Sequence, residues 1–410
     1  EHSLQGVENG YSAPYAYINN SYGYSYLWDN VLTYNVEPLK GHKVTLTGVT
    51  SWSHGQSDYN NMRASGQPLD SYLFYNMASG ITKYGVKSNY SQSQKMSYAL
   101  RFNYVYKDKY IASFTTRWDG ASHLASGHKW ESFPAGALAW RVSQEPFMKP
   151  TKKWLSNLKL RLSYGVTGNS GGMGAYSSQT GAATYSPVSI DGVLSSVSQL
   201  VSPYGNPSIG WEKTYQWNYG VDLGFFNNRI SLSFDYYDST TKDLLFSRTL
   251  PVTSAITAWG SPMTTWQNIG ETSNKGYEIQ LSTVNIKSRN FQWSSSISYT
   301  HNDEKIVDLP DGDLIAKKLF EGHPIKTFYD FKYAGIWSTA EEEEAAKYGC
   351  QPGYVKIQTV EQFTTDENGN LVGDGGVHTY SNTRDMQILG SNVPDGILGV
   401  NNTFKYRDFD

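Results

Sequence analysis

The sequence predicts an all-β protein, and more specifically part of a transmembrane antiparallel β-barrel. Three observations predict it: apolar and polar residues alternate with period two, several alternating segments are long, and short connections alternate with long ones along the chain. Strands in soluble proteins average about five or six residues, whereas a tilted strand needs about ten to cross a bilayer. The alternating segments of this chain reach that length.

The composition agrees with such a barrel and excludes several other classes. The 410 residues include 34 Lys and Arg against 37 Asp and Glu, so the net charge of −3 excludes a strong electrostatic footprint for nucleic acid. A single cysteine, Cys350, excludes an internal disulfide framework and a Cys-rich metal site. The mean hydropathy is −0.52, which a barrel can have because its strands alternate lipid-facing and lumen-facing residues. The chain opens with Glu1 rather than Met, and we expect a processed or partial polypeptide.

Four segments alternate most clearly. In 215–225 and 230–236 every second residue is apolar or aromatic, and Asn227-Asn228 between them predicts a tight hairpin because Asn tolerates positive φ. Segments 96–106 and 158–166 alternate in the same way. Weaker alternation predicts further strands at 24–36, 43–52, 110–118, 133–142, 276–284, 291–300, 325–337 and 397–406. About twelve strands are therefore expected.

Connection lengths distinguish a membrane barrel from a sandwich. Short links at 37–41, 107–109, 227–228 and 287–290 alternate with long excursions. Outer-membrane barrels have short periplasmic turns and long extracellular loops, whereas a sandwich has no reason for this order. The sequence predicts extracellular loops at 54–91, 167–210, 240–265 and 303–383, with a shorter one at 119–129 and a longer periplasmic turn at 143–156. Aromatic residues at strand ends suit interfacial girdles or an aromatic core: Tyr106, Tyr110, Trp118, Trp211, Trp293 and Tyr299.

The end of the chain leaves two arrangements open. If 325–337 and 397–406 are consecutive barrel strands, the connection between them falls on the periplasmic side, where it is far too long. Either 303–394 is mostly one extracellular excursion, or a further strand lies near 385–389. The acidic run 341–347 predicts one exposed helix in this region.

The sequence motifs of these strands, and their order along the chain, resemble those of the SusC/RagA family of TonB-dependent outer-membrane transporters of Bacteroidota. The matching motifs are 106–110 (YKDKY), 117–122 (RWDGAS), 130–133 (WESF), 140–143 (WRVS), 154–161 (WLSNLKLR), 163–169 (SYGVTGN), 211–214 (WEKT), 220–230 (GVDLGFFNNRI), 274–278 (NKGYE), 334–337 (AGIW) and 388–390 (ILG). They follow the family's order across nearly the whole chain. The chain departs at His123-Leu124, where the family has a basic-aromatic pair, and 366–376 looks like a decayed calcium loop with Val377 in place of the closing Glu.

The resemblance implies what the complete protein contains and does. Residues 1–410 would be a partial C-terminal β-barrel domain from a 22-stranded, plugged barrel, with the plug and the last strands outside this sequence. It implies TonB-dependent import of oligomeric nutrients, with glycan oligosaccharides first and oligopeptides second. The implied partners are a SusD-like lipoprotein, the TonB–ExbB–ExbD complex acting through the plug, and outer-membrane lipid, and a dimer of SusC–SusD pairs is compatible with it.

The residues themselves favour binding over catalysis. No spacing predicts a catalytic group, a cofactor site or a metal site: His123 and His128 suit solvated loop positions better than a metal pair, and 168–172 (GNSGG) lacks the context of a phosphate loop. Aromatic residues on the expected loops offer flat faces for sugars or peptides, although loop packing and partner contacts explain them equally well. These candidate binding residues are Trp52, Tyr59, Tyr72, Tyr75, Tyr185, Tyr204, Trp259 and Trp266.

A different class remains as the alternative. A secreted β-sandwich adhesin or carbohydrate-binding module would also be rich in aromatic, Gly, Ser and Asn residues. A passive porin is a third reading, which the family resemblance disfavours.

Overall fold

A computed structural model describes residues 15–67, 69–72, 74–80, 82–190, 193–200, 204–253, 262–365, 371–407 and 409. The strands are β1 (Tyr15–Leu39), β2 (His42–Ser65), β3 (Thr82–Tyr106), β4 (Tyr110–Ala121), β5 (Trp130–Arg141), β6 (Leu155–Asn169), β7 (Ala182–Ile190), β8 (Val193–Leu200), β9 (Glu212–Phe225), β10 (Ile230–Lys242), β11 (Leu245–Thr249), β12 (Thr264–Asn268), β13 (Glu271–Lys287), β14 (Phe291–Asp308), β15 (Thr327–Phe331), β16 (Tyr333–Ile336), β17 (Val355–Ile357), β18 (Phe363–Thr365), β19 (Leu371–Gly373), β20 (Met386–Ser391) and β21 (Ile397–Tyr406). The α-helix is α2 (Glu342–Lys347), and short 3-10 helices are η1 (Asp70–Tyr72), η2 (Met77–Ser79), η3 (Val142–Gln144), η4 (Pro146–Lys153), η5 (Ile315–Lys317) and η6 (Thr339–Glu341).

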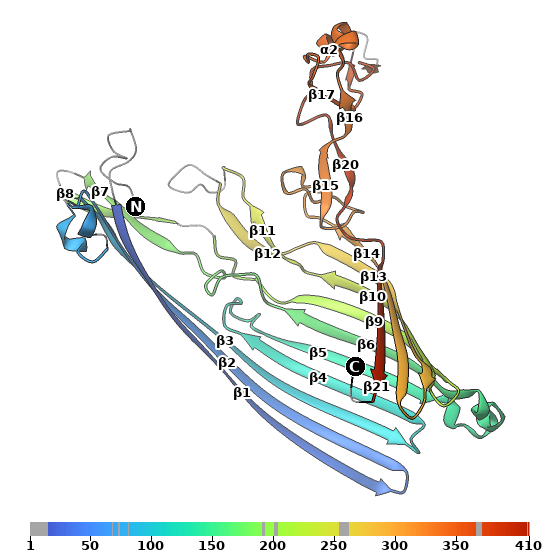
Figure 1. Cartoon of the computed structure of the whole chain (residues 1–410). Helices are drawn as coiled ribbons and strands as arrows, with labels where there is room; N and C mark the ends of the chain where they lie inside the picture. Colours follow the sequence, from blue (N-terminus) through green and yellow to red (C-terminus); the bar gives the residue numbers. More distant parts are fainter. Residues whose placement is uncertain are drawn as a thin grey trace. The chain divides into compact units, whose positions relative to one another are not determined.

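The all-β prediction is confirmed. Eleven strands form one sheet in the order β1-β2-β3-β4-β5-β6-β9-β10-β13-β14-β21. The strands pair antiparallel from β1 to β6 and from β13 to β21. Neighbours in the sheet are consecutive along the chain apart from short hairpins inserted in the long connections (Figure 1). Such a meander is the topology of a barrel wall and differs from the two packed sheets of a sandwich.

The twelfth expected strand, 325–337, does not belong to this sheet. Its residues form two short strands, β15 and β16, which pair with β20 and β17. The strand near 385–389 exists as β20, but it is the partner of β15. The connection from β14 to β21 is therefore a single excursion (Figure 1). Short and long connections alternate along the sheet except around β5, where the link 142–154 to β6 is longer than the link 122–129 from β4. The alternation of 325–337 misled the prediction because a hairpin in solvent and a barrel strand share period two.

The chain divides into two compact units, which are described separately: 1–219 with 241–269, and 220–240 with 270–410. In the first unit, residues that face each other across neighbouring strands share one face of the sheet. Tyr98 is opposite Trp118, and Phe102 is opposite Phe114. The same face continues on β6 through Leu160 and Leu162. Most of the large apolar and aromatic side chains of these strands lie on this face, and we call it the lipid face.

Two belts of rings border the lipid face. The first holds Trp28, Trp52, Tyr98, Trp118 and Trp130, and the ring centres of Tyr98 and Trp130 are 5.9 Å apart. The second holds Tyr104, Tyr106, Tyr110 and Trp140, beside the short turns. Tyr98 and Tyr106 are separated along β3 by about 26 Å, which the tilt of barrel strands reduces to a band of roughly 20 Å. The spacing and the aromatic borders are those of a bilayer crossing.

The turn between β5 and β6 is fastened to the second belt by one carboxylate. Glu145 Oε1 accepts hydrogen bonds from the Tyr110 hydroxyl at 2.7 Å and the Trp140 indole N–H at 3.2 Å. Its Oε2 accepts the Lys109 ammonium at 3.0 Å. The expected long periplasmic turn at 143–156 is thus an ordered element built of η3 and η4.

The opposite face of the first unit is polar. Arg117 pairs with Asp119 at 2.6 Å and donates to Ser97 Oγ at 2.9 Å. Side chains on successive residues of a strand alternate between faces, so this charged group lies behind the lipid face. Such a face suits the wet interior of a barrel.

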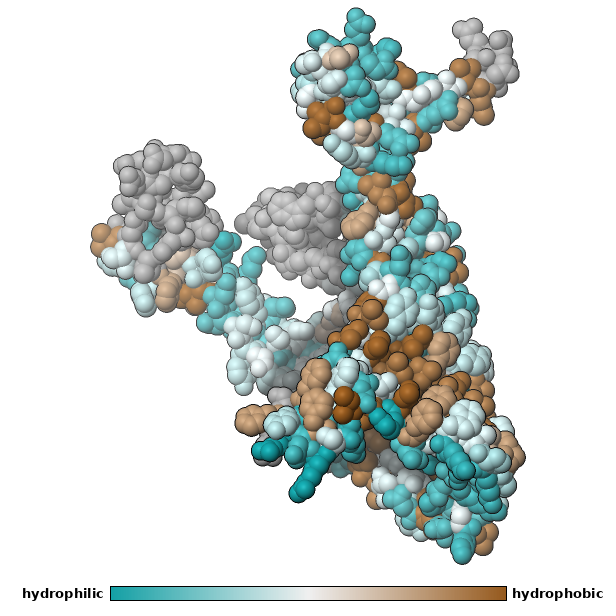
Figure 2. Space-filling view, turned by 45° about the vertical axis from the view of Figure 1, so that its right-hand side comes forward, coloured by the Kyte–Doolittle hydropathy of each residue, from teal (hydrophilic) through white to brown (hydrophobic). Residues whose placement is uncertain are grey.

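The second unit repeats the two-faced pattern on β13, β14 and β21. Ile297 is opposite Val400, and Trp293 stacks on Phe404 with ring centres 5.6 Å apart. Polar groups on this face bond to one another: Ser295 Oγ donates to Asn402 Oδ1 at 2.6 Å, as lipid requires of any polar group. Hydrophobic side chains gather over the strands in the space-filling view (Figure 2).

One expected loop is largely strand. Residues 54–91 were predicted as an extracellular loop, but β2 continues to Ser65 and β3 begins at Thr82, so only the middle of the segment is a connection. The backbone pairs through this whole extension, and its polar alternation made it resemble a loop. Among the described residues, no helix is long and apolar enough to span a membrane.

Candidate functional site

In the first unit, five connecting segments pack into one body, which we call the loop cluster. It consists of residues 122–129, 170–181, 204–211, 243–250 and 262–270. The Ala125 N–H donates to the Ile209 carbonyl at 3.0 Å, which ties the first segment to the third. The Tyr204 N–H donates to the Thr264 carbonyl at 2.7 Å, which ties the third to the fifth.

Asn268 connects the segments of the loop cluster through its side-chain hydrogen bonds. Its Oδ1 accepts the Gly210 N–H at 2.7 Å, and its Nδ2 donates to the carbonyls of Gly210 and Asp243 at 3.2 and 3.0 Å. One amide side chain therefore joins three loop segments. Gly205 makes a further close approach, because a Cβ there would lie 2.4 Å from the backbone of Thr180.

The loop cluster has its own apolar core. Buried Ala121, Leu124, Phe133 and Trp211 pack together, with the rings of Phe133 and Trp211 edge to face at 5.3 Å. Trp211 was grouped with the interfacial girdle, but it is buried and its indole donates to the Lys129 carbonyl at 2.9 Å. An aromatic residue at a strand end serves either purpose, so the sequence could not separate them. The loops are thus a preformed surface, as binding sites usually require.

His123 was expected at a solvated loop position, but the structure buries it beside this core. It is buried, and its Nε2 lies in hydrogen-bond contact with the Ser170 carbonyl. Burial lowers the pKa of His123, while the bond to Ser170 opposes that shift. The imidazole is therefore neutral near pH 7 and holds 122–129 against 170–181.

In the second unit, the excursion between β14 and β21 carries a small body, which we call the head, at residues 332–385. Strands β15 and β20 pair to form its stalk, and β16, β17 and α2 lie beyond them (Figure 1). The expected exposed helix at 341–347 is present as η6 and α2, begun by a capping box between Ser338 and Glu341. Three hydrogen bonds, to Ser338 and Lys356, lower the pKa of Glu341 to about 2.

Trp337 is the core of the head. It is buried, its indole N–H donates to the Tyr380 hydroxyl at 3.1 Å, and Tyr348 packs on it with ring centres 5.4 Å apart. The ammonium of Lys356 lies 4.1 Å from the Trp337 ring centre, a cation–π contact. A body this small depends on such specific contacts because it buries little apolar area.

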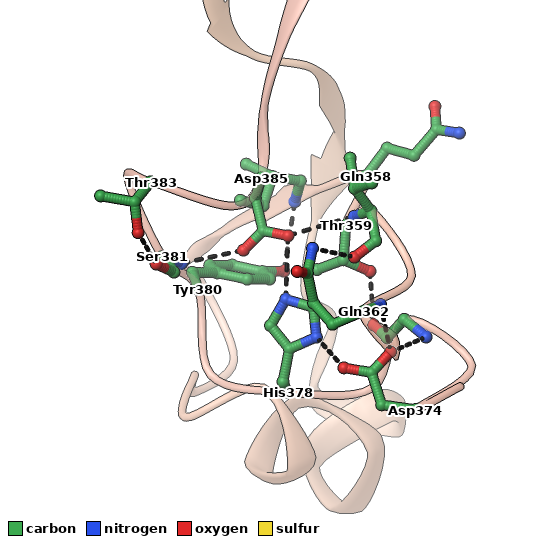
Figure 3. Close-up of polar contacts among 12 residues, drawn as sticks. Gln358, Thr359, Gln362, Asp374, His378, Tyr380, Ser381, Thr383 and Asp385 are labelled. Carbon is green, nitrogen blue, oxygen red and sulfur yellow. Dashed lines mark hydrogen bonds and ion pairs between the residues drawn. The ribbon is translucent and has the colours of Figure 1, made fainter. Parts of the chain in front are cut away.

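A second centre of the head is a histidine between two carboxylates (Figure 3). His378 Nδ1 is 2.7 Å from Asp374 Oδ2, and its Nε2 is 2.9 Å from Asp385 Oδ1. The buried Asp385 also accepts the N–H groups of Val360 and Ser381. The bonds to Asp385 and Asp374 raise the pKa of His378, and the pKa of each of these carboxyls is lowered although burial opposes this for both. Between pH 3.8 and 6.5 the group is therefore an imidazolium between two carboxylates.

Sequence reasoning missed this arrangement. Its members come from 360–385, which the sequence assigned to a loop, a decayed calcium loop at 366–376 and a possible strand from 385, and they meet through tertiary folding. The sole local signal was the spacing of Asp374 and His378, four residues apart.

The structure places the eight predicted binding residues in different surroundings. Tyr204 and Trp266 lie in the loop cluster, where Thr265 Oγ1 donates to the Tyr204 carbonyl and Asn206 Nδ2 donates to the Trp266 carbonyl, at 2.9 and 2.8 Å. Tyr72 ends η1, and Tyr75, 77% exposed, packs on Phe74. Trp259 and the side chain of Tyr185 lie outside the described residues.

Two of the eight are not loop residues. Trp52 and Tyr59 both lie within β2, because pairing with β1 and β3 continues past the bilayer segment. Trp52 faces the lipid side and meets Tyr26 edge to face at 5.3 Å. Tyr59 lies on the opposite face, and its hydroxyl donates to Asn19 Oδ1 at 3.0 Å.

Among the described side chains, no group of three or more His, Cys, Asp or Glu could hold a metal ion. Residues 366–370 of the decayed calcium loop lie outside the described part of the chain.

Comparison with known proteins decides the family. The family model described as "TonB dependent receptor-like, beta-barrel" matches residues 2–394. The chain belongs to this family. It is a β-barrel of the outer membrane, and the secreted sandwich alternative is excluded.

Relatives of this TonB-dependent receptor barrel come from Bacteroidota. TonB-dependent receptor P3 of Formosa agariphila is 31% identical over 99% of the chain and 39% of its own length. TonB-dependent receptor SusC of Bacteroides thetaiotaomicron is 30% identical over 99% of the chain and 39% of its length. The chain thus spans about two fifths of the curated relatives that it matches.

Solved structures agree on the fold. The structure titled "Structure of the RagAB peptide transporter" matches 95% of this chain and 41% of its own, with a TM-score of 0.75 at 22% identity. The same importer in its "open-open" state gives a TM-score of 0.77 at 22% identity. The resemblance to the SusC/RagA family, inferred from the strand phrases, is confirmed.

Proposed function

We propose that the complete protein imports an oligomeric nutrient across the outer membrane, with glycan oligosaccharides as the first substrate class and oligopeptides as the second. The observation that carries this proposal is the match to a SusC over 99% of the chain. The likeness of the fold to a structure named a peptide transporter supports the second class.

The partners in this proposal follow from the same family. A SusD-like lipoprotein would cover the extracellular end, where the segments 54–91, 167–210, 240–265 and 303–383 would lie outside the membrane. The TonB–ExbB–ExbD complex would supply energy through a plug domain encoded elsewhere in the complete protein. The exposed apolar residues of the head, such as Phe363 and Leu371 on β18 and β19, suit contact with another protein.

Among the candidate aromatics whose side chains the structure describes, Tyr75 and Tyr204 are the best placed for substrate. Both are exposed on connecting segments, at 77% and 42% of their surface, and Tyr204 is held by backbone bonds to the rigid loop cluster. A fixed, exposed ring can stack on a sugar or a peptide side chain without a large ordering cost.

The test uses the full-length protein with its neighbouring lipoprotein. Deletion of the gene should abolish growth on one oligosaccharide or peptide source, and the purified complex should bind that substrate in calorimetry. Tyr204→Ala should weaken binding roughly tenfold, about 1.4 kcal/mol, while Tyr34→Ala on the lipid face should not. Unchanged growth on all such sources, together with no detectable binding, would refute the proposal.

A further inference from the structure

The lipid face does not end at its first aromatic belt. Strands β1, β2 and β3 continue beyond the row Trp28–Trp52–Met96, with unbroken register as far as the row Ile18–Met62–Val86. The next three rows on the same face are Tyr26–His54–Gln94, Tyr24–Gln56–Gln92 and Tyr22–Asp58–Tyr90. We call these nine side chains the tyrosine–glutamine patch.

The patch is one continuous contact network. Tyr24 and Tyr26 stack on His54 with ring centres 5.7 and 5.0 Å apart. The hydroxyls of Tyr24 and Tyr90 donate to Gln56 Oε1 and Gln92 Oε1, each at 2.8 Å. The stacking and the bonds to glutamine fix the rings, yet Tyr22, Tyr24, Tyr26 and Tyr90 keep 67, 42, 42 and 47% of their surface exposed.

The height of the tyrosine–glutamine patch in the membrane follows from its distance to the first aromatic belt. Tyr22 lies six residues beyond Trp28 on β1, which is about 20 Å along the strand and roughly 15 Å above the belt at the tilt of barrel strands. The belt marks the edge of the hydrocarbon. The patch therefore faces outward, away from the polar interior, at the height of the lipid head groups.

The chemistry of the patch suits sugars rather than phosphates. From the Trp28 row to the row Ile18–Met62–Val86, the described side chains of this face include no lysine or arginine. Phosphate recognition depends on those cations. Fixed rings with amide groups beside them offer an apolar face and hydrogen bonds together, as a saccharide requires.

The inner face of the same rows is different, which shows that the rings are not a general feature of this extension. There the rows Gly23–Ser57–Ser91 and Ser25–Gly55–Ser93 carry only small side chains. Within these rows the aromatic residues are gathered on the side that continues the membrane surface, and Tyr59 on the inner face lies one row further out.

We propose that the tyrosine–glutamine patch binds the saccharide head groups of glycolipids in the outer leaflet of the outer membrane. The patch is continuous with the lipid face, lies at head-group height and has the side chains for neutral sugars. A second copy of this chain and the partner lipoprotein are the other occupants that the test separates.

The test uses the full-length protein in phospholipid nanodiscs, supplied either with the intact glycolipid of the host outer membrane or with the same glycolipid stripped of its saccharide by mild acid. Native mass spectrometry counts the molecules retained. Wild type should retain the intact form several-fold more than the stripped form. The double variant Tyr24→Ala/Tyr26→Ala should lose that preference.

Two further variants keep the result interpretable. Tyr24→Phe/Tyr26→Phe preserves the stacked rings and should retain most of the preference, and Tyr34→Ala, on the same strand and face within the hydrocarbon, should behave as wild type. A heat-modifiable band in gels checks that each variant is folded. Equal retention of both lipids by wild type, or an unchanged preference in the double alanine variant, would overturn the proposal. The proposal would also be overturned if the double alanine variant lost its association with a second copy or with the lipoprotein but retained the glycolipid.

Discussion

Gly168 shows how one residue without a side chain fixes the loop cluster. The ring of Phe133 occupies the place of its missing Cβ, which would lie 2.0 Å from Phe133 Cζ. Phe133 in turn packs against Trp211 in the core of the cluster. The glycine at position 168 is thus explained by packing on a neighbouring strand, which a single sequence cannot reveal.

We predict that Gly168→Ala destabilises the protein by about 1–3 kcal/mol, the usual cost of overpacking. The added methyl group must displace the Phe133 ring from the core. Gly136→Ala is the matched control, because its Cβ would come no closer than 3.8 Å to another group. The measurement is the temperature at which the folded, heat-modifiable form of the full-length protein is lost. Equal temperatures for both variants would contradict the explanation.

His378 makes the stability of the head depend on pH. Its pKa is raised above the ordinary 6.5, so its contribution is complete below pH 6.5 and is lost as the pH rises through the raised value. The pKa values of Asp374 and Asp385 are lowered from 3.8, so their contribution is complete above that value and is lost in stronger acid. The head should be most stable between about pH 4 and 6.5.

Hydrogen exchange tests this pH dependence directly. The amides of Val360 and Ser381, which bond to Asp385, should lose protection above pH 6.5 after correction for intrinsic exchange rates. His378→Gln should lower their protection in the acid range and remove the change at higher pH. His323→Gln, elsewhere in the same excursion, is the control. Protection that does not vary with pH in wild type would disprove the role of the imidazolium.

At the scale of elements, the turn between β5 and β6 depends on Glu145. It is the common acceptor for Lys109, Tyr110 and Trp140, so it joins the turn to the aromatic belt. We predict that Glu145→Ala frees η4 and raises its rate of trypsin cleavage at Lys152 and Lys153 several-fold. Glu145→Gln keeps an acceptor for the two neutral donors and should be cleaved more slowly than the alanine variant.

A control distinguishes these contacts of Glu145 from an ordinary surface ion pair. The ion pair between Lys43 and Asp108 is also near a short turn, but both side chains are more than half exposed. Exposed pairs contribute little, so Asp108→Ala should leave cleavage of η4 unchanged. Equal cleavage of wild type and Glu145→Ala would show that the contacts of Glu145 do not hold the turn.

The long strands were predictable from sequence because each satisfies one simple rule, apolar on one face and polar on the other, over ten or more residues. The head was not, since β17, β18 and β19 have three residues each, too few for alternation to be recognised. The loop cluster depends on contacts such as Asn268 with Gly210, 58 residues apart. Period two describes a strand but does not say which strands share a sheet, and this is why 325–337 was wrongly placed in the barrel wall.

At the scale of the whole molecule, the assignment of the lipid face can be tested with two adjacent residues of β4. Phe114 is opposite Phe102 and four residues from both Tyr110 and Trp118, so it lies at the middle of the apolar band. Ser113 is its neighbour in sequence and therefore faces the polar side. A lysine at the bilayer midplane costs about 2–4 kcal/mol on the lipid face of a barrel, and far less on the lumen side.

We therefore predict that Phe114→Lys lowers the yield of folded, heat-modifiable full-length protein in phospholipid bilayers, whereas Ser113→Lys does not. The two variants add the same charge to the same strand at nearly the same depth, so only the face differs. Phe114→Leu keeps the surface apolar and should behave as wild type, which separates the charge from the loss of the ring. If Ser113→Lys were the damaging variant, the faces would be reversed, and the outward direction of the tyrosine–glutamine patch would be reversed with them.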